Sequence, residues 1–159
     1  MTTPVRPSEP SQGAAAFPWV QIAALVLGFL LLMFGLAGFW PTSFESLGPG
    51  DSPARLLGIE VSPLHNTLHI ALGLVGMISA TRLSAARKWG WLLVAAGVVF
   101  VVMGVVGVVS PDLDVLGMNI AAIVVEALIA LAGLVLAVGP VHRPFPFTGP
   151  RQQDLPGVR

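Results

Sequence analysis

The chain contains no cysteine among its 159 residues. That absence excludes disulfide bonds, thiolate metal sites, a cysteine nucleophile and a lipidated N-terminal cysteine. Charged residues are also scarce, at 10% of the chain, whereas a soluble domain carries about 25%. Eight basic residues balance eight acidic ones, so the chain has no basic excess for binding nucleic acid.

Apolar residues make up 55% of the chain and gather in long runs, which indicates an integral membrane protein in contact with the lipid bilayer. A helix needs about 20 apolar residues to cross a hydrocarbon core about 30 Å thick. The sequence therefore predicts an all-α fold, a bundle of four transmembrane helices. The predicted spans are residues 18–40, 62–80, 89–109 and 116–138, within a membrane domain of residues 18–139.

The segments outside this domain, residues 1–17 and 140–159, are polar and rich in proline, so we expect both to be disordered tails. Basic residues predict the orientation, because lysine and arginine gather on the cytoplasmic side of a membrane. With the N-terminus inside, seven basic residues lie on the inner side and Arg55 alone lies on the outer side. The sequence thus predicts a multi-pass protein of the cell membrane with both termini in the cytoplasm.

Three connections join the predicted spans. The longest, residues 42–61, contains Gly-Pro-Gly at residues 48–50, a sequence typical of a turn. Residues 81–88 are expected to form a short basic loop, and residues 110–115 a tight acidic loop with Asp112 and Asp114. We interpret these two aspartates as solvated charges rather than ligands.

Glycines recur at matching places in the two halves of the chain. A shift of 69 residues places Gly28, Gly35 and Gly38 on Gly97, Gly104 and Gly107. A shift of 57 residues places Gly76 on Gly133, Gly73 on Ala130, His69 on Glu126, and Ser62 on Asn119. The pattern predicts two duplicated helical hairpins related by an axis along the membrane normal, a parallel repeat. The alternative is chance alignment of glycine-rich helices, and in either case we expect these glycines to permit close helix packing.

Polar side chains lie inside two of the apolar spans. His65 and His69 are four residues apart and share one helix face, a spacing that suits a metal ion but does not define a site alone. An ionised Glu126 inside the last span costs at least about 2.5–3.5 kcal/mol, so it should be protonated, paired or beside a wet cavity. Because His69 and Glu126 occupy equivalent positions, we expect them to meet near the repeat axis. The predicted polar cluster adds His65, Asn66 and Asn119 above this pair.

Two short motifs carry a family resemblance: LHNTLH opens the second span and LGMN opens the fourth. Together with the glycines three apart beyond the first motif, they resemble small four-helix membrane proteins of actinobacteria, grouped as a domain of unknown function. The resemblance covers residues 19–139 and implies no activity. In that family the second and fourth spans each begin with asparagine and histidine. His65, Asn66 and His69 match the first motif and Asn119 the second, where Glu126 replaces the expected histidine.

These observations favour a non-enzymatic accessory or scaffold protein whose polar cluster is structural and which carries no cofactor. A homo-oligomer or a membrane-protein partner fits this interpretation, because one thin bundle is expected to expose glycine faces. Two alternatives stay open. One is a small proton-linked transporter or channel that uses Glu126, and the other is a metal- or haem-bearing membrane subunit that uses His65 and His69. Phosphate-binding loops, serine nucleophile motifs and paired carboxylates are absent from the sequence.

Overall fold

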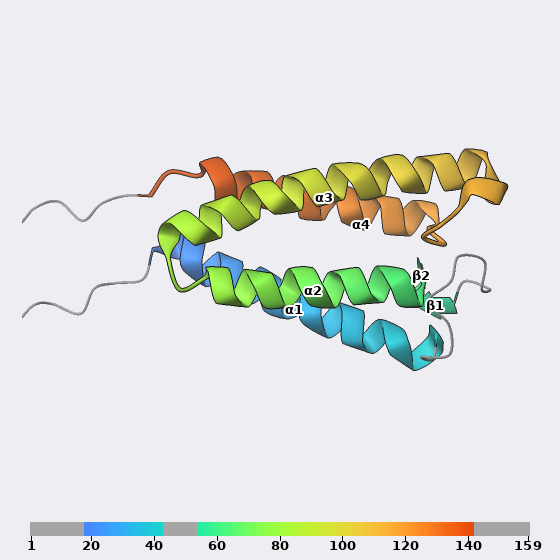
Figure 1. Ribbon diagram of the computed structural model, residues 1–159, viewed down its shortest axis with the longest axis horizontal. Helices are drawn as coiled ribbons and strands as arrows, with labels where there is room; N and C mark the ends of the chain where they lie inside the picture. Colours follow the sequence, from blue (N-terminus) through green and yellow to red (C-terminus); the bar gives the residue numbers. More distant parts are fainter. Residues whose placement is uncertain (1–17, 43–53, 142–159) are drawn as a thin grey trace, which may run out of the picture.

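The computed structural model describes residues 18–42 and 54–141. The Gly-Pro-Gly segment and the two predicted tails, except residues 140 and 141, lie outside the described residues. Within them the chain forms an all-α bundle of four antiparallel helices (Figure 1). The helices are α1 (Trp19–Thr42), α2 (Pro63–Ser79), α3 (Leu83–Val109) and α4 (Ile120–Val138).

Three of these helices, α1, α3 and α4, are long and apolar enough to cross a membrane. The 17 residues of α2 make a helix about 26 Å long, shorter than the others. It runs beside α1 and returns the chain from the far end of α1 to the start of α3 (Figure 1). Large apolar side chains remain exposed along the outer faces of the helices, as expected for surfaces that face lipid.

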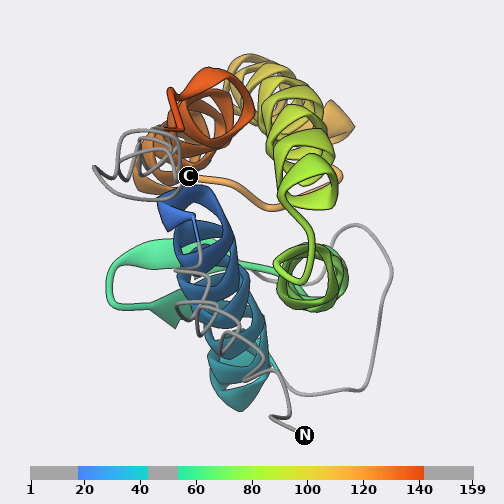
Figure 2. The same ribbon diagram turned by 90° about the vertical axis from the view of Figure 1, so that its left-hand side faces the viewer.

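The helices pair as two hairpins, because α1 packs mainly on α2 and α3 mainly on α4. Viewed along the bundle, the two hairpins lie one above the other (Figure 2). Side-chain hydrogen bonds to backbone oxygens connect helices both within and between the hairpins. Gln21 Nε2 donates to Ala80 O within the first hairpin, Trp89 Nε1 to Leu72 O and Trp19 Nε1 to Pro140 O between the hairpins.

Helix contacts recur at equivalent positions of the two hairpins. A Cβ added at Gly28 would lie 2.9 Å from Gly73 O, and one at Gly97 would lie 2.7 Å from Ala130 Cβ. In the same way Gly35 approaches Asn66 and Gly104 approaches Ile123. The N-caps match too, since Ser62 accepts from His65 N and Asn119 accepts from Ala122 N. The two hairpins therefore pack alike at these positions, as the predicted repeat requires.

Two helices begin at places other than those predicted. Helix α3 begins at Leu83, so most of the predicted loop at residues 81–88 is helical, and Arg87 in its first turns donates a hydrogen bond to Gly139 O. Helix α4 begins at Ile120 rather than at residue 116. Gly117 has a left-handed φ of 61° and donates its N–H to Asp114 Oδ1, which keeps the preceding segment out of the helix. Asp114 is therefore a turn acceptor rather than only a solvated charge.

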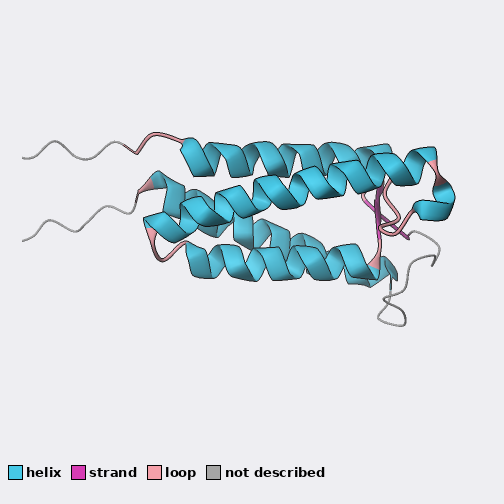
Figure 3. Ribbon diagram, turned by 45° about the horizontal axis from the view of Figure 1, so that its top comes forward, coloured by secondary structure: helices cyan, strands magenta, loops and turns pink. Residues whose placement is uncertain are grey.

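A small β-hairpin lies at the end of the bundle opposite the described chain ends (Figures 1 and 3). Strands β1 (Ala54–Leu56) and β2 (Ile59–Val61) pair in antiparallel fashion, with Leu56 opposite Ile59. The turn residues Leu57 and Gly58 have φ values of 53° and 84°, the positive pair that a two-residue type I′ turn requires. These strands and the 3₁₀ helix η1 (Pro111–Leu113) were not predicted from the sequence.

Candidate functional site

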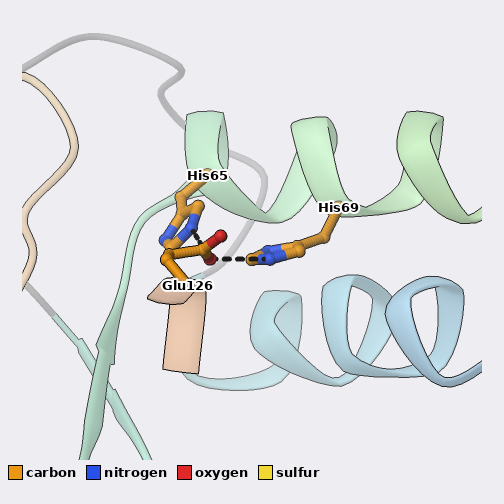
Figure 4. A group of neighbouring side chains, drawn as sticks. All are labelled: His65, His69 and Glu126. Atoms are coloured by element: carbon orange, nitrogen blue, oxygen red, sulfur yellow. Dashed lines mark hydrogen bonds and ion pairs between the residues drawn. The ribbon is translucent and has the colours of Figure 1, made fainter. Parts of the chain in front are cut away.

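Three polar side chains meet between the two hairpins (Figure 4). The Ser62 cap and Pro63 at the first helical turn start α2, and this start places His65 and His69 on successive turns of one face. Glu126 reaches toward them from α4. His69 and Glu126 each lie seven residues beyond the N-cap of their helix, about 10 Å along its axis, so their depths match. Since α4 begins at Ile120 rather than at residue 116, Glu126 lies closer to the start of its helix than the predicted span implied.

One carboxylate oxygen contacts both imidazoles. Glu126 Oε1 lies 2.9 Å from His65 Nε2 and 2.9 Å from His69 Nε2, and each of the three residues is 1% exposed. The His65 contact is a hydrogen bond. At His69 the distance is equally short, but no hydrogen bond forms from Nε2 within the described residues. We call His65, His69 and Glu126 the triad from here on.

Aromatic side chains enclose the triad. Phe34 of α1 meets the His69 ring edge-on at a centroid distance of 5.3 Å, and Phe100 of α3 meets the His65 ring at 5.5 Å. Phe100 belongs to a buried apolar group with Leu116, Met118 and Ala122. Neither phenylalanine was predicted as a site residue. The available signal was the position of the packing glycines, since Phe34 directly precedes Gly35 and Phe100 lies three residues after Gly97.

The two asparagines predicted above the pair form hydrogen bonds with residues outside the triad, whereas His65 joins the triad directly. Asn66 packs against Gly38, and its Nδ2 donates to Thr42 Oγ1 at 3.2 Å, so it joins α1 to α2. Asn119 caps α4 through Oδ1, and its Nδ2 donates to Gly58 O at 2.9 Å in the β-hairpin. The hydrogen bonds of both asparagines are thus made at helix ends and between elements rather than to the triad.

The nine predicted packing glycines are all buried against helices or loops of this same chain. They are Gly28, Gly35, Gly38, Gly73, Gly76, Gly97, Gly104, Gly107 and Gly133. Gly76, for example, packs against the indole of Trp89, a contact between the two hairpins. Because these glycines pack inside the bundle, they do not form the exposed glycine faces on which the expectation of a homo-oligomer was based. Gly90, which the sequence analysis missed, makes a comparable contact with Gly133.

The triad is also the group of residues that could hold a metal ion in the described part of the chain. One ligand atom from each of His65, His69 and Glu126 lies within 4.8 Å of the others. Chemically, such a group can act as a hydrogen-bonded tie between helices, hold a proton, or bind a cation.

The fold and this enclosed triad define a small helical membrane protein with a buried polar site between two hairpins. The chain belongs to the family described as Domain of unknown function (DUF4383), whose family model matches residues 21–139. The match extends from the start of α1 to the end of α4 and confirms the family resemblance seen in the motifs. No curated protein matches the sequence, and no solved structure matches it.

Proposed function

We propose that the protein is a non-enzymatic accessory or scaffold protein of the cell membrane, in which the triad fixes its two helical hairpins against each other. One observation carries this proposal: Glu126 Oε1 on α4 lies 2.9 Å from Nε2 of both His65 and His69 on α2. Because α2 belongs to the first hairpin and α4 to the second, these contacts tie the two hairpins together.

The free-energy cost of burying a charge makes the contact between the hairpins specific for one docking geometry. A carboxylate inside a membrane costs at least about 2.5–3.5 kcal/mol when it has no partner, and the two imidazoles offset that cost only in one arrangement. If one hairpin slid along the other by a helical turn, about 5.4 Å, Glu126 would keep at most one of its two imidazole partners. Buried polar contacts of this kind select one docking geometry more than they add net stability.

Enclosure of the triad favours this structural role over proton transport. Each triad residue is 1% exposed, and Phe34 and Phe100 pack against the imidazole rings. A transport site must exchange with water from at least one side of the membrane. A site that only ties helices together has no such requirement.

The arrangement of basic residues supports an orientation with both termini in the cytoplasm. Arg82, Arg87 and Lys88 lie at the end of the bundle where α1 begins and α4 ends, and Arg87 contacts Gly139 O there. At the opposite end the single basic residue among those described, Arg55, is paired with Glu60 at 2.9 Å. Because basic residues near helix ends are in excess on the cytoplasmic side, this arrangement favours a β-hairpin outside the cell.

Exchanging the acid and the base between positions 69 and 126 tests whether the triad holds the two hairpins together. His69→Glu places two carboxylates together and Glu126→His places three imidazoles together, so each single variant should lower the free energy of unfolding by about 3 kcal/mol. The double variant restores one acid and two bases, and we expect it to recover most of the loss. Thermal unfolding of the purified protein in detergent, followed by circular dichroism, measures the effect.

Two results would contradict the proposal. One is a double variant no more stable than the worse single variant, which would mean that the pair does not hold the hairpins. The other is proton flux into liposomes carrying the protein that stops on Glu126→Gln, which would favour the proton-linked alternative. Asp112→Asn, a change at an exposed outer carboxylate, is the control for both measurements.

A further inference from the structure

We propose that His65, His69 and Glu126 form the binding site of one divalent transition-metal ion, of the class that includes zinc and iron(II). This inference rests on the proposed function, since it names a ligand for the same triad that ties the hairpins together. The ion lies between α2 and α4 and adds coordination bonds to that tie.

The donor atoms are those that such ions use. Histidines four residues apart on a helix present both rings on one face, as in helical zinc-binding motifs, and His65 and His69 have that spacing. Glu126 adds a carboxylate oxygen from a second helix. Two imidazoles and one carboxylate bind zinc and non-haem iron(II), whereas calcium and magnesium take oxygen ligands. The residue types therefore select a transition metal.

The ligand atoms are already close to one another. Glu126 Oε1 lies 2.9 Å from both Nε2 atoms, and all three residues offer a ligand atom within a span of 4.8 Å. Two ligands of a tetrahedral zinc ion, with bonds of about 2.0–2.1 Å, lie about 3.3 Å apart. The widest pair must therefore approach by about 1.5 Å, a movement within reach of small rotations about imidazole side-chain torsions.

One ring nitrogen indicates coordination rather than hydrogen bonding. His69 Nε2 is 2.9 Å from Glu126 Oε1, yet it has no hydrogen-bond partner within the described residues. The side chain is 1% exposed, so bulk water does not reach this nitrogen. A nitrogen that meets a carboxylate without hydrogen-bond geometry gains little from that contact, and a metal ion bound to its lone pair would satisfy it.

The charge of the triad also favours a cation. The ion-pair partners of Glu126 among the described residues are the two histidines. With neutral rings and an ionised carboxylate the triad carries one net negative charge in apolar surroundings. These are the protonation states that metal binding requires, and a divalent ion supplies positive charge at the same depth.

The surroundings of the rings set the expected affinity. Metal-bound histidines usually donate their second ring nitrogen to a protein acceptor, and loss of that contact lowers affinity about 10- to 100-fold. In the described residues neither His65 Nδ1 nor His69 Nδ1 has such a partner. We therefore expect micromolar rather than nanomolar binding, with slow exchange because Phe34 and Phe100 cover the rings.

The test is zinc binding by the purified full-length protein in detergent. The protein is stripped with a chelator and dialysed against Zn²⁺, and the bound metal is counted per chain. Co²⁺ is used in parallel because its visible absorption reports the number and type of ligands. We expect about one ion per chain, as for a three-ligand site, and a rise in Tm of about 5 °C at saturating zinc.

Two variants and two controls make the test specific. Glu126→Gln keeps the side-chain size and an oxygen that accepts hydrogen bonds, and His69→Gln keeps a polar group of similar length, so both are expected to fold. Each should lower zinc affinity at least about 10-fold and abolish the Co²⁺ spectrum. Asp112→Asn, at an exposed carboxylate, and His142→Ala, at the third histidine of the chain outside the described residues, should leave binding unchanged.

Equal zinc binding by the wild type and Glu126→Gln, or loss of binding on His142→Ala, would show adventitious binding and overturn the metal site. The absence of bound zinc at about 100 μM free ion would overturn it as well, since micromolar sites are then saturated. If the exchange of His69 and Glu126 nevertheless restores stability, the tie between hairpins stands without a metal ion. The two proposals can therefore fail separately.

Discussion

Seven residues beyond the N-cap of its second helix, the first hairpin carries a histidine and the second hairpin carries a glutamate. In other respects the hairpins follow one packing plan, with glycines between the paired helices and a capping side chain at the start of α2 and of α4. The bases of one copy and the acid of the other meet only when the hairpins are docked. The assembled bundle, rather than either hairpin, therefore carries the polar site.

The hairpins also differ in how closely their helices approach. A Cβ added at Gly73 would lie 2.5 Å from Leu32 N and 2.6 Å from Gly28 O, whereas the second hairpin already carries Ala130 at the equivalent position. The first hairpin is therefore packed backbone against backbone where the second has a methyl group between its helices.

Gly73→Ala is expected to have the largest effect of the changes that probe this difference. The atoms that the new methyl group would meet belong to the backbone of α1, so the helices must separate to admit it. We expect a loss of about 3 kcal/mol or more in the free energy of unfolding, measured by denaturation in detergent. The reciprocal change Ala130→Gly should cost no more than about 1 kcal/mol. Equal losses would show that the two hairpins are packed alike.

Thr42→Val tests a polar contact that the second hairpin lacks. Asn66 Nδ2 donates to Thr42 Oγ1, and Asn66 is fully buried, whereas Ile123 occupies the equivalent position in the second hairpin. Valine keeps the shape of threonine and removes the acceptor, so we expect a loss of about 1–2 kcal/mol in the same unfolding measurement. Thr67→Val, at an exposed site on α2, is the matched control, and a comparable loss there would contradict the assignment.

The two N-caps give the smallest predicted effects and compare the hairpins most directly. Ser62→Ala removes one cap hydrogen bond and should cost about 1 kcal/mol. Asn119→Ala removes a cap and also the bond to Gly58 O, so its loss in unfolding free energy should be larger. If Ser62→Ala proved the more damaging, the bond from Asn119 to the β-hairpin would contribute nothing to stability.

The apolar spans and the meeting of His69 with Glu126 were predictable from the sequence for physical reasons. Long uncharged runs have few alternatives to membrane helices, and a repeat offset places equivalent residues at equal depth. The match of Ser62 with Asn119 under the same offset also anticipated the paired caps. These signals recur along the chain, so they can be recognised without knowledge of the tertiary structure.

Other features depend on tertiary contacts that no local sequence pattern predicts. Residues 83–88 contain Arg87 and Lys88, which are typical of a loop between spans, but helix α3 extends through them and Arg87 contacts Gly139 O. The strands β1 and β2 have three residues each, too few for a readable alternation. Asn66 and Asn119 looked like members of the polar cluster because they lie near it in sequence, yet tertiary contacts direct both to other partners.

The most direct test of the central claim, that the triad couples the two hairpins, is a double-mutant cycle between His69→Ala and Glu126→Ala. Unfolding free energies of the wild type, both single variants and the double variant give the coupling energy. The account predicts a coupling of about 1–3 kcal/mol, and additivity within about 0.5 kcal/mol for the control cycle of Thr67→Val, at an exposed site on α2, with Glu126→Ala. Additivity in the His69 cycle as well would contradict the claim, because residues of one buried group do not act independently.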